Sequence, residues 1–148
     1  MFQMRLSRKH ERGSTLVEFS IAATVFLTAM FSILEFGRAL WVHNALADAA
    51  RRGARYAIVH RAADIESVKN VVVYDNPAGG TQPVVENLTT ANVTVTYSSF
   101  SLNSGTASVG ITNYQFQFVL PILDTTINMP DYQTTLTAEC AGLVPANQ

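Results

Sequence analysis

The chain has 148 residues, of which 48% are hydrophobic and 14% are charged. This length allows one compact domain with an accessory segment, rather than two domains. A formal net charge of -1 does not provide the basic surface that a duplex binder needs, so we expect no nucleic-acid partner. The single cysteine, Cys140, cannot form an internal disulfide, so the fold must depend on packing.

The charges change sign along the chain. Residues 1–13 carry four basic side chains and one acidic side chain, a net charge of +3, whereas the remainder carries six basic and ten acidic side chains, a net charge of -4. The change occurs at the edge of an apolar run, as the positive-inside rule describes. We therefore expect a cytoplasmic N-terminus and a C-terminal body on the other side of a membrane.

The apolar run from Leu16 to Leu34 contains a single charged residue, Glu18. As a helix these 19 residues would rise roughly 28 Å, close to a bilayer core of about 30 Å. No proline or turn cluster interrupts residues 14–61, so we predict one helix that is transmembrane over 14–35 and amphipathic over 36–62. The apolar residues expected on its packing face are Phe36, Leu40, Ala47, Ala50, Ala54, Ala57 and Ile58.

Two further features of this helix follow from its sequence. Asp48 can pair with Arg52 one turn later. Gly37 and Gly53 each weaken a helix by about 1 kcal/mol relative to alanine, so a bend at either glycine is open.

Four small hydroxyl residues recur every fourth position within the apolar run: Ser20, Thr24, Thr28 and Ser32. Such a ridge permits close approach of another helix and hydrogen bonding across the interface, where lipid supplies no hydrophobic force. Alternatively, each hydroxyl bonds the carbonyl one turn back in its own helix. The sequence leaves both interpretations open.

Glu18 is costly in hydrocarbon, by about 2.5–3.5 kcal/mol on insertion scales, and so requires a membrane edge or a cationic partner. Cleavage after Gly13 would remove the +3 leader and make Ser14 a new N-terminus, with Glu18 as the fifth residue. The new amine would then be a cationic partner. The alternative is that Gly13 is a turn glycine and Glu18 an ordinary acidic residue at a helix start. This explains each residue alone, but not why they occur together between a basic leader and an apolar run.

Three motifs resemble those of the TadE-like minor pilins, or pseudopilins, of the tight-adherence (Flp) pilus system within the type IV pilin superfamily. They are the Val-Glu-Phe start that includes Glu18 and Phe19, the Glu-Phe-Gly-Arg exit at 35–38, and the Gly-Ala-Arg-Tyr-Ala ending at 53–57. The motif residues of the exit and the ending are Glu35, Phe36, Gly37, Arg38, Ala54, Arg55 and Tyr56. The resemblance covers about residues 13–57.

The resemblance implies a prepilin peptidase that cuts between Gly13 and Ser14, with Glu18 and Phe19 then acting in assembly. The implied partners are other pilins and pseudopilins of the system, an inner-membrane assembly platform and the membrane itself. The implied location is the bacterial inner membrane, with the C-terminal domain periplasmic or incorporated in an adhesive surface pilus. Two departures from the family pattern are Thr24, where many relatives have proline, and Arg52, where many have an acid.

Residues 63–148 have the sequence patterns of a small α+β domain. A short helix or helix-to-strand segment ends at the turn-forming residues 76–80. Period-two alternation then predicts strands near 91–98, 107–119 and 132–141, as a three-stranded antiparallel meander with one polar face. The small residues of the helix would cover the apolar face, giving an α+β pilin-like fold. Cys140 is expected on the buried face.

No pattern in the sequence indicates an enzyme. The three histidines and Cys140 are not spaced as a metal site, and no phosphate-binding loop or nucleophile elbow is present. We therefore expect no catalysis, cofactor, metal or small-molecule substrate. The alternative to a pilin is a single-pass, signal-anchored periplasmic binding module that does not polymerise and whose Gly13 stays uncut.

Overall fold

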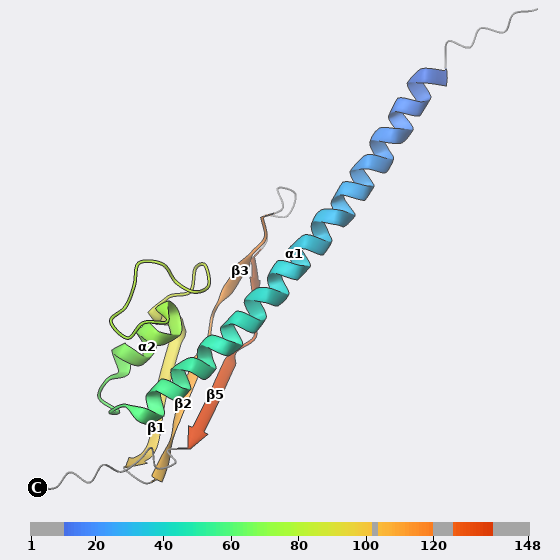
Figure 1. Cartoon of the computed structure of the whole chain (residues 1–148). Helices are drawn as coiled ribbons and strands as arrows, with labels where there is room; N and C mark the ends of the chain where they lie inside the picture. Colours follow the sequence, from blue (N-terminus) through green and yellow to red (C-terminus); the bar gives the residue numbers. More distant parts are fainter. Residues whose placement is uncertain (1–10, 102–103, 120–125, 138–148) are drawn as a thin grey trace, which may run out of the picture. The chain divides into compact units, whose positions relative to one another are not determined.

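The computed structural model describes residues 11–101, 104–119 and 126–137. The chain divides into two units, unit 1 over residues 1–38 and unit 2 over residues 39–148. In chain order, the elements are α1 (Glu11–Val59), α2 (Ile65–Tyr74), a 3-10 turn η1 (Thr90–Asn92), β1 (Val93–Ser101), β2 (Ser104–Ile111), β3 (Gln115–Gln117), β4 (Thr126–Asn128) and β5 (Tyr132–Thr137). This α+β arrangement confirms the predicted fold class (Figure 1).

Unit 1 contains the apolar half of α1. The helix forms because the segment lacks proline and is rich in good helix formers. Its large apolar side chains, among them Leu16, Phe19 and Ile33, are exposed. Within the described residues, α1 is the helix that is long and apolar enough to cross a membrane.

Unit 2 contains a three-stranded antiparallel sheet of order β1-β2-β5. Val93 of β1 lies opposite Ile111 of β2, and Ile111 lies opposite Tyr132 of β5. All three side chains are buried, whereas the neighbouring Thr94 and Gln133 are exposed. The alternation therefore separates an inner apolar face from an outer polar face, as the sequence predicted.

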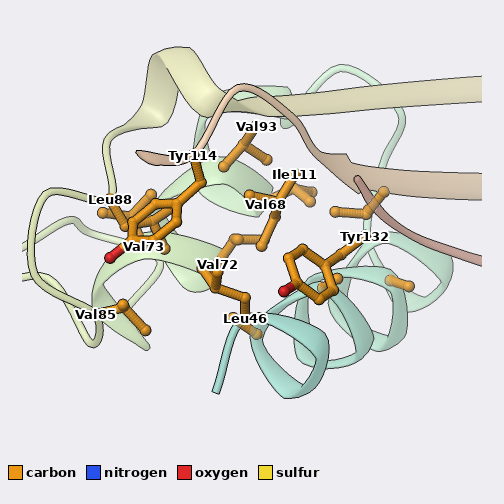
Figure 2. Close-up of a cluster of buried hydrophobic side chains, with 14 of the residues drawn as sticks. Leu46, Val68, Val72, Val73, Val85, Leu88, Val93, Ile111, Tyr114 and Tyr132 are labelled. Carbon is orange, nitrogen blue, oxygen red and sulfur yellow. The ribbon is translucent and has the colours of Figure 1, made fainter. Parts of the chain in front are cut away.

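The inner face of the sheet packs against the second half of α1 and against α2 in one buried cluster. Figure 2 shows Leu46 of α1 and Val72 of α2 in the same cluster as Ile111 and Tyr132 of the sheet. The fully buried alanines of α1 let the other elements approach closely. These alanines are Ala49, Ala50, Ala54 and Ala57.

Gly53 has a packing role rather than a bending role within this cluster. The helix α1 continues through it without a break. A Cβ atom at this position would clash with Cγ2 of Val72 and would lie 3.3 Å from Cγ1 of Val109. Only glycine therefore fits between α1, α2 and β2 at this point.

The predicted packing face of the helix needs a correction. Ala50, Ala54 and Ala57 are buried, but Phe36 and Leu40 are exposed, and Val42 and Leu46 supply the large buried side chains instead. The packing face follows i, i+4, i+7 spacing from Val42 onward. Phe36 precedes Ala54 by about five full helical turns, but it lies in unit 1, outside the buried cluster of unit 2. Leu40 lies about 120° around the helix from the buried Leu46, so the assignment of both residues to the packing face was wrong.

The predicted second strand, 107–119, is wrong as a single strand. It divides into β2, which ends at Ile111, and β3, which pairs with β4 in a separate two-stranded sheet. Between them, Asn113 has a left-handed backbone with φ 57°. The side-chain amide of Asn92 donates to the carbonyl oxygens of Thr112 and Asn113 at 3.2 and 3.1 Å, which holds the turn.

The other strands differ at their ends. β1 begins at Val93, because residues 90–92 form the 3-10 turn, and it continues to Ser101. The third predicted strand begins at Tyr132, as expected, and is described to Thr137. Its predicted remainder at 138–141, including Cys140, lies outside the described residues.

Candidate processing and anchoring site

The residues of the predicted cleavage site lie in the first turns of α1. Gly13, Ser14 and Glu18 are all helical and exposed. Ser14 precedes Glu18 by four residues, which is the spacing at which side chains meet on one helix face. One shallow face of the helix carries Gly13, Ser14, Val17, Glu18, Ile21 and Ala22.

Gly13 lies inside α1 rather than in a turn before it. A Cβ atom added at Gly13 would meet nothing within 4 Å, so packing does not require glycine here. Phe19 is also exposed on the helix. The structure thus leaves the whole candidate cleavage segment accessible within unit 1.

The four hydroxyls of the ridge all bond within the helix. Ser20, Thr24, Thr28 and Ser32 each donate to the carbonyl oxygen four residues earlier, and every one of these oxygen–oxygen distances is 2.8 Å. This is the local bonding that the second interpretation described. All four residues are exposed, and a hydroxyl that donates one bond can still accept another. A role in helix contact stays a prediction that depends on their small size.

The Glu-Phe-Gly-Arg motif forms an ion pair at the end of the apolar run. Nη2 of Arg38 lies 2.9 Å from Oε2 of Glu35, and the Glu35 side chain is only 13% exposed. Phe36 points outward, and Gly37 has open space around it. The pair neutralises a carboxylate that would be costly to leave uncompensated.

The residues of the last motif have three different environments. Ala54 is fully buried in the core of unit 2, whereas Arg55 is exposed. Tyr56 is half-buried, and its ring stacks on His60 with centroids 3.7 Å apart. The motif therefore combines one core position with a polar helix surface.

Arg52 joins two elements, and the sequence predicted only half of this arrangement. Its Nη1 lies 2.6 Å from Oδ2 of Asp48, which confirms the predicted pair. Its Nε lies 3.1 Å from Oδ1 of Asp75, the left-handed residue that ends α2. Because Arg52 has two carboxylate partners, its charge is compensated. The Asp75 contact depends on tertiary packing and carries no sequence signal.

A second link that the sequence did not indicate joins α1 to β5. Nδ1 of His43 and the hydroxyl of Tyr132 are 2.7 Å apart, and their rings meet edge to face at 5.2 Å. Burial, with a smaller contribution from Tyr114, raises the pKa of the Tyr132 phenol. This hydrogen bond fixes the start of β5 against the helix.

Unit 2 also contains a polar hollow of about 310 Å³ beside the β3-β4 sheet. It is lined by Asn87, Asn92, Asn113, Gln115, Gln117 and Thr126. The lining carries no charge, so it is not suited to phosphate or a metal ion. Within residues 11–101, 104–119 and 126–137, no group of three or more His, Cys, Asp or Glu side chains could hold a metal.

The comparison with protein families finds a match in the first part of the chain. The family described as TadE-like protein matches residues 13–55. No curated protein and no solved structure matches the chain. The family is a structural, non-enzymatic one that is associated with the Tad pilus. Residues 13–55 are therefore similar to the TadE-like proteins, as the sequence motifs predicted.

Proposed function

We propose that this chain is a minor pilin or pseudopilin of a Tad-type adhesive pilus, matured by a prepilin peptidase that cuts between Gly13 and Ser14. The observation that carries the proposal is the start of the family match at Gly13. At this residue the +3 leader ends, and the apolar run begins three residues later. A cut after Gly13 removes the leader and keeps residues 14–55 of the matched segment.

Glu18 gains a partner from the cut. The new amine at Ser14 would be cationic and one helical turn from the carboxylate of Glu18, on the helix face that both residues share. The pairing offsets a cost of about 2.5–3.5 kcal/mol for an acid in hydrocarbon. The amine of a neighbouring subunit can provide the same neutralisation, which would favour Glu18 in assembly.

Gly13 makes the cleavage segment easy to open. Glycine in a helix costs about 1 kcal/mol relative to alanine, and helix ends open locally at little cost. The absence of packing around Gly13 means that opening of the first turn breaks no tertiary contact there. A peptidase can therefore reach the bond without disturbing unit 2.

The proposed membrane anchor implies a location for the leader, for the apolar helix and for unit 2. The leader stays in the cytoplasm by the positive-inside rule, residues 14–35 cross the inner membrane, and unit 2 lies in the periplasm before assembly. The proposed partners are the peptidase, the other pilins and pseudopilins, and the assembly platform. No small-molecule substrate is part of this function.

The cut is tested by the N-terminal residue of the mature chain, measured by mass spectrometry from cells with and without the peptidase. We expect Ser14 at the N-terminus only when the peptidase is present. Gly13→Leu should block the cut. Gly37→Leu is the matched control, because this glycine lies in the same helix with equally open surroundings. Mature protein that begins at Met1 in cells with the machinery would refute the proposal.

The role of Glu18 is tested separately from the cut. Glu18→Gln removes the charge with little change of shape, so the variant should insert into the membrane but fail to assemble into fibres. Glu18→Asp retains the carboxylate and should assemble better than the Gln variant. Normal fibre assembly by Glu18→Gln would contradict the neutralisation mechanism while leaving the cleavage site intact.

The amide-lined hollow favours a second candidate function, the anchored binding module. Uncharged amides and a hydroxyl suit a neutral ligand rich in hydroxyl groups, and a volume of about 310 Å³ is at the lower end of ligand pockets. A module of this kind needs no cleavage at Gly13. An uncut chain in cells that contain the peptidase would therefore favour this candidate over the pilin.

A further inference from the structure

Four of the large apolar side chains exposed in unit 2 come from elements that reach one end of it (Figure 1). They are Leu40 and Trp41 of α1, Val119 after β3, and Ile127 of β4, and we call them the apolar end. Their exposed fractions are 48%, 59%, 72% and 48%. Apolar side chains at this exposure are common singly, but a group at one end of a small unit indicates a binding surface.

Contacts within unit 2 indicate that the α1 residues and the residues near β3 and β4 belong to the same end. Gly53 packs near Val109 of β2, whereas His43 bonds Tyr132, which lies opposite Ile111 at the end of β2. β2 therefore runs toward the N-terminal turns of α1 in this unit. β3 follows β2 and continues beyond it, and in Figure 1 the β3-β4 sheet extends in that direction.

The chain enters unit 2 at this same end. α1 is continuous from the apolar run into residues 39–59, so Leu40 and Trp41 are in the first helical turn of the unit. At about 1.5 Å per residue, Trp41 follows residue 35, where the anchor ends, by roughly 9 Å along the helix. The headgroup layer on each side of a bilayer is about 5–8 Å thick. Because helical side chains lean toward the N-terminus of their helix, the Trp41 ring would reach back into this layer.

We propose that the apolar end of unit 2 rests on the membrane surface, with Trp41, Leu40, Val119 and Ile127 in the lipid headgroup layer. Tryptophan is enriched at this depth because its ring is apolar and its N–H is polar. The described residues of β3, β4 and the first turn of unit 2 contain no charged side chain. Contact of these elements with lipid headgroups therefore buries no ion, and the exposed carboxylate of Asp131, just before β5, can remain in the aqueous part of the headgroup layer. The inference rests on the membrane anchoring in the proposed function.

The single tryptophan of the chain makes the test direct. The full-length protein is reconstituted into phosphatidylcholine–phosphatidylglycerol vesicles whose acyl chains carry bromine close to the headgroup. Trp41 should show blue-shifted emission, lose most of its fluorescence to the bromolipid, and be protected from iodide in the aqueous phase. Val119→Trp in a Trp41→Phe background should behave in the same way.

Two further single-tryptophan chains provide matched controls. Val59→Trp, also with Trp41→Phe, places the ring at the other end of α1 in unit 2, roughly 27 Å away along the helix, at a site of similar exposure, 56%. It should be quenched by iodide and not by bromolipid. Phe26→Trp lies near the centre of the apolar run and should respond to bromine placed deep in the acyl chains.

The outcomes separate the inference from the proposed anchor. Lipid quenching at Trp41 and at position 119, but not at position 59, supports the apolar end as the membrane-facing surface. Deep quenching at position 26 with aqueous quenching at Trp41 overturns the inference and leaves the anchor standing. Equal lipid quenching at 41 and 59 also overturns it. Aqueous quenching at position 26 rejects the anchor, and the inference with it.

Discussion

Replacement of Gly53 by alanine tests how closely α1, α2 and β2 must approach. The new Cβ would clash with Cγ2 of Val72 and would lie 3.3 Å from Cγ1 of Val109. Both valines are fully buried, and a β-branched side chain in a helix has one strongly preferred rotamer, so Val72 cannot swing away. The helices must therefore separate to accommodate one methyl group.

The magnitude follows from two opposing terms. Overpacking of a core costs about 1–3 kcal/mol, whereas alanine in place of a helical glycine gains about 1 kcal/mol. Because the added Cβ clashes with a buried methyl group, the overpacking cost should lie at the upper end of this range, about 2–3 kcal/mol. We therefore expect Gly53→Ala to lower the free energy of unfolding by about 1–2 kcal/mol, with a melting temperature that falls by roughly 4 °C per kcal/mol. Thermal unfolding of the full chain in detergent, followed by near-ultraviolet circular dichroism, measures this.

Two variants control for other causes. Gly37→Ala makes the same change in the same helix where nothing lies within 4 Å, so it should not destabilise the protein. Val72→Ala removes the clashing methyl group, so Gly53→Ala should cost less in that background than in the wild type. A melting temperature for Gly53→Ala equal to or above the wild-type value would refute the close-approach argument.

Three other predictions concern the links within unit 2. Arg52→Met should lower the free energy of unfolding by about 1 kcal/mol or less, and by less in high salt, because its ion pairs are partly exposed. Arg51→Met, at an exposed neighbouring position, should change the free energy little, and equal effects of the two variants would contradict the bridging role of Arg52. Tyr132→Phe should cost about 0.5–1.5 kcal/mol in urea unfolding, because the hydrogen bond to His43 is lost, and an unchanged midpoint would show that the bond adds nothing. Burial raises the phenol pKa of Tyr132 and of Tyr97, so these phenols ionise first in the unfolded state and the free energy of unfolding should fall as pH rises through about 10. Unfolding curves measured at alkaline pH check this prediction, and a free energy of unfolding that rises over that range would contradict it.

The long helix, its apolar run and its local bonds could be predicted from the sequence. A helix and its i, i+4 contacts, such as the Asp48–Arg52 pair and the hydroxyl bonds of Ser20 and Thr24, depend on residues within one turn. The sheet's inner and outer faces were also predictable, because alternation records which side is buried. The family motifs over 13–55 lie in the same helix.

Strand partners could not be predicted in the same way, because residues far apart in the chain decide them. The alternation over 107–119 continues through Asn113, although the left-handed backbone there ends one sheet and starts another. The threonine–asparagine pair was a weak turn signal that could have indicated the break, since asparagine tolerates this conformation. The three-residue strand β4 carries too short a pattern to detect.

By itself, the sequence determined where the helix and its apolar run lie and which face of each strand is buried, because neighbouring residues fix these properties. The tertiary structure alone decided why Gly53 must be glycine, that Arg52 reaches Asp75, and that Tyr132 meets His43. Each of these depends on two or more elements packed at van der Waals distance, and packing geometry at that scale leaves no periodic trace in the chain.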